Sequence, residues 1–232
     1  MIRTVAGKDL RTLWTSPVPY LAGAVLQAVL GLLVVDQLAS RNQAVLQPLF
    51  PLAGFLLLLV VPVLTMRAFA EEARSGTLDQ LLAVPVRTGP LVVAKWLAAW
   101  LSALVVLAPA GAFVALTALW GDPDDGPAIA GFVGLTLLAG VAAAVGVLAS
   151  ACTESQPIAA VAALFAGMVA WFAHVGDPAA GDAGLLAAIS LSERLRLFAG
   201  GAIDSGDVAF LLTATAGALV LAATVLDLRR LR

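Results

Sequence analysis

Six apolar runs, separated by short polar segments, dominate the pattern of positions along the chain. A helix that spans a bilayer needs about 20 mostly apolar residues. The runs therefore predict six transmembrane helices: Pro17–Val35, Pro48–Met66, Leu91–Trp120, Ala128–Ala151, Pro157–Ala173 and Val208–Leu226. Because the third run is longer than a span requires, its first four residues are expected to be a cytoplasmic lead-in, with the span itself over 95–120.

The composition places these runs in a membrane. Hydrophobic residues make up 61% of the 232 residues and charged residues 12%, and the mean hydropathy is +1.00. A soluble domain is about 45–50% apolar and about 25% charged. We therefore predict an all-α membrane protein with a single transmembrane domain over residues 1–232. The net charge of −2 gives no indication of a nucleic-acid partner, and one cysteine, Cys152, excludes an intrachain disulfide.

Basic residues in the polar segments set the predicted orientation. With a cytoplasmic N-terminus, ten of the thirteen Lys and Arg residues lie on the cytoplasmic side: three before the first span, four around the segment between spans two and three, and three after the last span. The outer loops are acidic instead. Both termini are therefore predicted to be cytoplasmic, in a multi-pass protein of the cell inner (cytoplasmic) membrane. The tryptophans fall near the predicted interfaces, which is typical of interface anchors: Trp14, Trp96, Trp100, Trp120 and Trp171.

The N-terminal segment Ile2–Thr15 is amphipathic. Its apolar stripe and its separate basic residues predict a helix that lies in the inner interface, with a solvated tail as the alternative. The stripe consists of Ile2, Ala6, Leu10 and Leu13.

The segment before the sixth span, Leu185–Phe210, is also amphipathic, and it lies on the outer side. One interpretation is a short outer helix or a re-entrant hairpin, with Leu191, Leu195 and Phe198 on one face. Asp207 is expected to cap the sixth span. The fourth span is rich in glycine, which predicts close helix packing at Gly131, Gly134, Gly140 and Gly146.

Lys95 stands at the first position of the third span, and the other five predicted spans contain no charged residue. Charged residues inside a membrane are usually functional, so ion-coupled transport is disfavoured. The sequence has no HExxH, GxSxG or Walker A motif. For His174, the one histidine, an interface position is favoured over a metal or proton site. We therefore expect no catalytic site, cofactor or metal in this chain, and the energy for any transport would come from another protein.

The longest polar-rich stretch, Ala70–Gly89, lies between spans two and three. The second span is expected to continue into it and to be broken at Ser75–Gly76. Thr77 and Gln80 then have the spacing of a capping box, and Pro85 ends the next helix near Ala83. This pattern predicts two turns of helix with one apolar face, formed by Leu78, Leu81 and Leu82.

A helix of two turns is not stable alone. It is expected to dock either on its own bundle or in a groove of a soluble partner.

The stretch RAFAEEARSGTLDQLLAVPVRTGPLVVAKWLAAW (Arg67–Trp100) resembles the cytoplasmic signature of type-2 ABC exporter permeases. The matching positions are Glu71, Glu72, Arg74, Gly76, Thr77, Leu78, Leu81, Leu82, Pro85 and Lys95. A second stretch, SERLRLFAGGAIDSGDVAF (Ser192–Phe210), is similar to the segment before the last span in the gliding-motility (GldF-like) branch. Six spans, a cytoplasmic N-terminus and short loops agree with the family over essentially the whole chain.

The resemblance implies a permease that forms a homodimer, or pairs with a similar permease, and binds two copies of a separate cytoplasmic ABC ATPase. ATP and Mg²⁺ would be held by that ATPase. Thr77–Ala83 would be the coupling helix, Ile2–Thr15 the elbow helix beside it, and the dimer interface would hold the substrate path, lined by spans one, two and five. The residues expected to contact the ATPase or support that contact are Thr77, Leu78, Gln80, Leu81, Leu82, Glu71, Glu72, Arg74, Gly76 and Pro85.

Three functions compete at this point. The first is a transport subunit that couples ATP hydrolysis in a partner to export, or to mechanical transmission toward an exported auxiliary protein. The second is a membrane anchor or scaffold that holds a soluble cytoplasmic partner without transport. The third, a membrane-embedded enzyme of lipid metabolism, is disfavoured by the uncharged spans.

Overall fold

The computed structural model describes residues 2–41, 47–77, 88–118, 125–176 and 189–230. Within these ranges the chain is helical and contains no strand. The elements are α1 (Ile2–Thr15), α2 (Val18–Arg41), α3 (Leu49–Thr65), α4 (Ala70–Arg74), α6 (Thr88–Leu107), α7 (Ala110–Ala118), α8 (Asp125–Cys152), α9 (Gln156–Trp171), η1 (Ala173–Gly176), α11 (Leu191–Ala199) and α12 (Ser205–Arg230).

The described helices match five of the six predicted spans in length, and the remaining match is shorter. Five helical stretches are long and apolar enough to cross a membrane: α2, α3 with α4, α6 with α7, α8 and α12. The predicted fifth span corresponds to α9, which is apolar but has 16 residues, fewer than the roughly 20 of an ordinary span.

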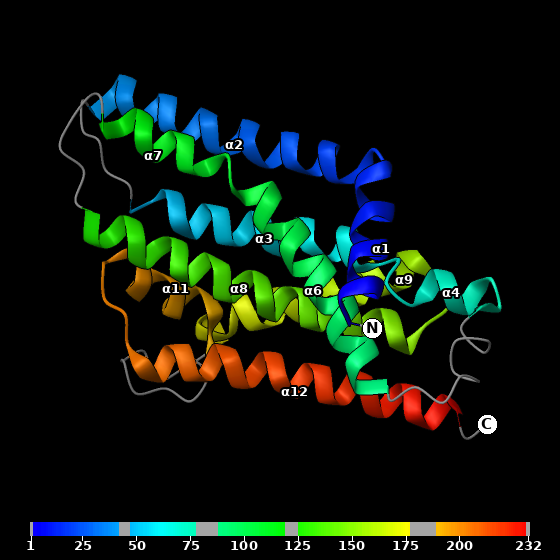
Figure 1. Cartoon of the computed structure of the whole chain (residues 1–232). Coiled ribbons are helices and arrows are strands. Elements are labelled where there is room, and N and C mark those ends of the chain that lie inside the picture. Colours follow the sequence, from blue (N-terminus) through cyan, green and yellow to red (C-terminus); the bar gives the residue numbers. More distant parts are fainter. Residues whose placement is uncertain (1, 42–46, 78–87, 119–124, 177–188, 231–232) are drawn as a thin grey trace.

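Helix α8 lies at the centre of the bundle. It packs against α3, α6, α9, α11 and α12, and the long helices run side by side around it (Figure 1). Helix α1 crosses one end of the bundle, and α4 and the last turns of α12 lie at that same end (Figure 1). Helix α11 packs on α8 and α3 toward the opposite end.

Glycines let other helices approach α8 closely. A Cβ atom on Gly131 would lie 2.6 Å from the Phe50 ring, and one on Gly134 would lie 2.8 Å from Phe198. A Cβ on Gly146 would lie 2.0 Å from the Oγ1 atom of Thr65. These distances confirm the close packing predicted at three of the four glycines, whereas a Cβ on Gly140 would lie at an ordinary 3.6 Å from Trp100.

Two tryptophans join α6 to α8. The indole N–H groups of Trp96 and Trp100 donate to the backbone oxygens of Gly140 and Thr136, at 2.9 and 3.0 Å. Their rings stack with centroids 5.4 Å apart. The interpretation as interface anchors therefore missed a contact inside the bundle.

The predicted third span is broken in two. Pro109 has no N–H group to continue the hydrogen-bond ladder, so α6 ends at Leu107 and α7 begins at Ala110. The side-chain amide of Gln27, on α2, donates to the carbonyl oxygen of Val106 at 2.8 Å. Because the last carbonyls of a helix lack a partner within it, this bond satisfies a group at the break.

The segment predicted to lie on the outer side contains a helix, α11, with the predicted apolar face. Leu191, Leu195 and Phe198 are buried. The predicted cap at Asp207 is wrong, because Asp204 precedes α12 and accepts a hydrogen bond from the Gly206 N–H at 3.3 Å. Asp207 lies in the first turn and forms an ion pair with Arg194 of α11.

The contact between Gly146 and Thr65 yields a stability prediction. A Gly146→Ala substitution should destabilise the protein by about 1–3 kcal/mol, because overpacking at a buried site forces backbone or rotamer shifts. The measurement is the apparent melting temperature in detergent. The matched control is Gly217→Ala on α12, where an added Cβ meets no atom within 4 Å; this helical position should be neutral or stabilised. Equal melting temperatures for the two variants would contradict the packing described for α8.

Candidate functional site

The helix of the predicted second span is interrupted where it reaches the end of the bundle. Helix α3 ends at Thr65, a turn follows, and α4 begins at Ala70. The span therefore continues to Arg74, as predicted, but with an interruption over residues 66–69 that was not predicted. The Thr65 carbonyl accepts a hydrogen bond from the Ala68 N–H at 2.9 Å, which tightens the chain into this turn.

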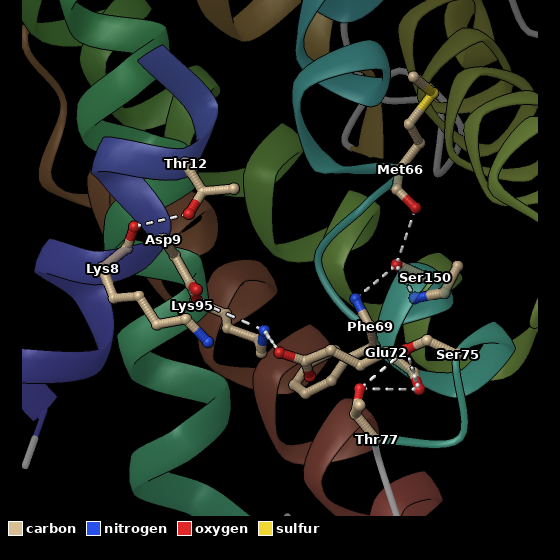
Figure 2. A network of polar contacts seen from close by, with 11 residues as sticks. Lys8, Asp9, Thr12, Met66, Phe69, Glu72, Ser75, Thr77, Lys95 and Ser150 are labelled. Atoms are coloured by element: carbon tan, nitrogen blue, oxygen red, sulfur yellow. Dashed lines mark hydrogen bonds and ion pairs between the residues drawn. The ribbon is translucent and has the colours of Figure 1, made fainter. Parts of the chain in front are cut away.

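The side chain of Ser150, on α8, explains the interruption. In a continuous helix the Ala70 N–H would donate to the Met66 carbonyl four residues earlier. Instead, the Ala70 N–H donates to Ser150 Oγ at 3.0 Å, and Ser150 Oγ donates to the Met66 oxygen at 3.1 Å (Figure 2). The Phe69 N–H also donates to Ser150 Oγ, at 2.9 Å. The serine hydroxyl is thus inserted into the hydrogen-bond ladder, a known cause of sharp helix bends.

A lysine then fixes α4 against two other helices. Lys95, on α6, lies 2.8 Å from a carboxylate oxygen of Glu72 and 3.4 Å from one of Asp9 on α1 (Figure 2). Its side chain is 4% exposed, and its ammonium lies 4.9 Å from the centroid of the Phe69 ring. One buried cation therefore holds α1, α4 and α6 together.

The polar cluster borders a cavity of about 240 Å³ between α1, α3, α4 and α6. Basic, acidic and hydroxyl side chains line it, together with apolar residues that include Leu13, Leu64 and Ala99. Arg67, in its wall, donates to the Ser16 hydroxyl at 3.3 Å. This bond links the α3–α4 turn to the connection between α1 and α2.

Helix α4 ends as the sequence predicts. Gly76 has φ +70°, a conformation that glycine adopts without the steric cost of a Cβ. The Thr77 hydroxyl donates to the Glu72 carbonyl at 3.3 Å and shares a 2.8 Å hydrogen bond with Ser75. These bonds close the end of α4 before the chain continues.

The structure brings some of the predicted site residues together. Glu72 lies in the cluster, Gly76 and Thr77 form its edge, and Glu71 and Arg74 are exposed on α4. The other predicted residues lie outside the described ranges: Leu78, Gln80, Leu81, Leu82 and Pro85. The docking helix itself stays a prediction.

The α3–α4 joint consists of the turn between these helices, α4 itself and the side chains that hold them in place. Three residues of this joint were not among the predicted site residues. Lys95 belongs to the matching signature, which was a usable signal. Nothing in the sequence pointed to Asp9 or Ser150, because their partners lie far away in the sequence and neither residue is part of a recognisable motif.

The side chains of Lys95, Glu72 and Asp9 join three helices through ion pairs. Within the described residues, no three or more His, Cys, Asp or Glu side chains gather as a metal site would require. His174, near the opposite end, shares hydrogen bonds of 3.2 and 3.1 Å with the Ser190 and Ser192 hydroxyls, and both serines donate to the Trp171 carbonyl. These bonds join η1 to α11.

Removal of the buried cation should weaken the joint. A Lys95→Met substitution should destabilise the protein by about 3 kcal/mol, since two partly buried carboxylates lose their counter-ion. The apparent melting temperature in detergent measures this. The control is Arg196→Met, which breaks an ion pair with Glu193 at 2.8 Å whose arginine is 64% exposed; an exposed pair contributes about 0–1 kcal/mol. A Lys95 variant as stable as the Arg196 variant would rule out a structural role for the ion pairs of Lys95.

Comparison with known proteins gives the family. No curated protein matches the chain. The family model described as "ABC-2 family transporter protein" matches residues 21–198, which is 178 of the 232 residues, and this range includes α3, α4, α6, α8 and most of the joint. The chain therefore belongs to the ABC-2 transporter family, as a multi-pass membrane permease component of an ABC transporter.

Proposed function

We propose that this permease couples ATP hydrolysis in a separate cytoplasmic ATPase to export, or to mechanical transmission, across the inner membrane. The observation that carries the proposal is the α3–α4 joint: a short polar helix is fixed at one end of an apolar bundle by Ser150 and Lys95. A membrane anchor without transport activity would need only an exposed helix to which the soluble partner binds. A joint tied into α1, α6 and α8 suits a device that passes force into the bundle.

The proposed topology has six spans and cytoplasmic termini. Helices α1 and α4 and the end of α12 lie at one end of the bundle (Figure 1), and most of the Lys and Arg residues lie in or beside these segments. Helix α9 would be a short fifth span. In this arrangement α1 is the elbow helix in the inner interface, with Lys8 and Arg11 exposed.

The proposed ATPase contact is the helix that follows Thr77. Its apolar face would consist of Leu78, Leu81 and Leu82, with Glu71 and Arg74 exposed on the neighbouring α4. Two ATPase copies would bind a dimer of permeases, either identical or similar. ATP and Mg²⁺ would be bound by the ATPases, and this chain would have no catalytic site of its own.

The segment around α11 supports placement in the gliding-motility (GldF-like) branch, with an exported auxiliary protein as an outer partner. Helix α11 is packed into the bundle through Leu195 and Phe198. In the proposal, a movement of the bundle would therefore displace α11 and reach a partner on the outer side. The matched stretch Ser192–Phe210 overlaps this helix and the start of α12.

The coupling proposal is tested at the two leucines. A Leu81→Asp/Leu82→Asp double substitution should abolish co-purification of the ATPase, because two carboxylates cannot enter an apolar groove without a large desolvation cost. The measurement is ATPase recovered per permease after affinity purification. The matched control is Ile203→Asp, at an exposed apolar position on the proposed outer side, which should retain the ATPase. Full recovery with the double variant would reject the docking helix.

The native cysteine tests the topology. Cys152 is exposed at the end of α8, at the proposed cytoplasmic end. A membrane-impermeant maleimide should label it in inside-out vesicles and leave it unlabelled in right-side-out vesicles. A Cys152→Ser/Ile203→Cys variant should show the reverse pattern. Labelling of Cys152 from the outside would invert the proposed orientation.

A further inference from the structure

We propose that Ser150 is a positioning residue through which α8 receives the movement of α4, so that force from the ATPase enters the bundle at its central helix. The inference rests on the coupling function proposed above. It assigns to α8 a role that the chain connectivity does not suggest, since α4 is joined covalently to α3 and leads along the chain toward α6.

All the hydrogen-bonding capacity of the Ser150 hydroxyl is taken up by contacts within the joint. A serine hydroxyl can donate one hydrogen bond and accept two. It donates to Met66 and accepts from Phe69 and Ala70, and Ser150 is 0% exposed. Water cannot replace it at a fully buried position, so the geometry of the break depends on this one side chain.

The neighbouring turn of α8 strengthens the contact. Gly146 lies four residues before Ser150 and therefore on the same helix face, where its lack of a side chain admits Thr65. Val147 and Ala151 pack in one buried cluster with Phe69. The end of α3, the turn and the start of α4 thus rest on α8, and a displacement of α4 must either move α8 or break these contacts.

Helix α8 can carry such a displacement across the bundle. It runs without a break for 28 residues, a length of about 42 Å at 1.5 Å per residue. Near its other end, Gly134 contacts Phe198 and Leu195 of α11. Helices α3 and α6 both meet breaks, at Thr65 and Pro109, whereas α8 joins the cytoplasmic joint to α11 as one element.

The test uses the complete permease–ATPase complex and hydrogen exchange of its backbone amides. In Ser150→Ala the amides of Phe69 and Ala70 should exchange at least about tenfold faster than in wild type, because they lose their acceptor. The matched control is Ser102→Ala. Ser102 is also 0% exposed, but its hydroxyl donates within α6, to Ala98 at 2.8 Å, so its loss should leave these amides unchanged. Unchanged exchange in Ser150→Ala would overturn the assignment.

A second measurement separates positioning from mere stability. Each complex is compared for its rate of ATP hydrolysis relative to the same ATPase without permease. Ser150→Ala should abolish the difference that wild-type permease makes, and Ser102→Ala should retain it. Ser150→Thr and Ser150→Val add similar volume but differ in the hydroxyl, so threonine should restore the effect and valine should not.

The outcomes also distinguish the two proposals. If wild-type permease brings down no ATPase, or leaves its hydrolysis rate unchanged, the proposed function fails. If wild type changes the rate and Ser150→Ala does so equally, the coupling function stands and the role of Ser150 is rejected. Equal behaviour of the threonine and valine variants would likewise reject it, because the hydroxyl would then be irrelevant.

Discussion

The joint depends on one constraint: in an apolar bundle, every backbone polar group freed by a helix break needs a partner from another element. Two breaks in the described residues show this, and at each a side chain from a different helix supplies a partner. Ser150 is inserted between the Met66 carbonyl and the Ala70 N–H. Gln27 donates to the Val106 carbonyl beside Pro109. A break that is satisfied in this way is held at one angle and can transmit movement.

The charged residues follow from the same constraint. Lys95 is buried near the end of the bundle, where burying a charge is costly unless the charge is paired. Glu72 and Asp9 supply the counter-ions from α4 and α1. The cost of burying these groups is offset only while all three helices keep their places. The cluster therefore specifies the arrangement of α1, α4 and α6 more than it adds to stability.

Much of the fold could be predicted from the apolar runs, because a span is a local property of about 20 consecutive residues. The amphipathic faces of Ile2–Thr15 and Leu191–Phe198 were readable for the same reason. Pro109 is a local signal for the break between α6 and α7, but the break was not predicted because the apolar run continues across it. The sequence analysis assigned the N-cap of α12 to Asp207. A single sequence does not show that the Asp207 carboxylate forms an ion pair with Arg194 of α11 instead.

The candidate site was predicted only in part, for a physical reason. Its conspicuous carboxylates, Glu71 and Glu72, are adjacent, yet one is exposed and the other is paired. The two carboxylates differ in their surroundings for two reasons. Lys95, 23 residues from Glu72, pairs with that carboxylate, and Ser150, 80 residues from Ala70, sets the direction of α4. Contacts over such distances are decided by how helices pack, and no local pattern records them.

The distribution of polar contacts within the bundle bears on how such a protein could move. Between its ends, α8 packs mainly through glycine, alanine and apolar side chains, but its Gly140 and Thr136 carbonyls accept hydrogen bonds from Trp96 and Trp100 of α6. At the α4 end, hydrogen bonds and ion pairs fix the joint in discrete positions. In the proposed coupling, a rigid contact at the α4 end and these two bonds would make α6 follow α8 when α8 shifts as a unit.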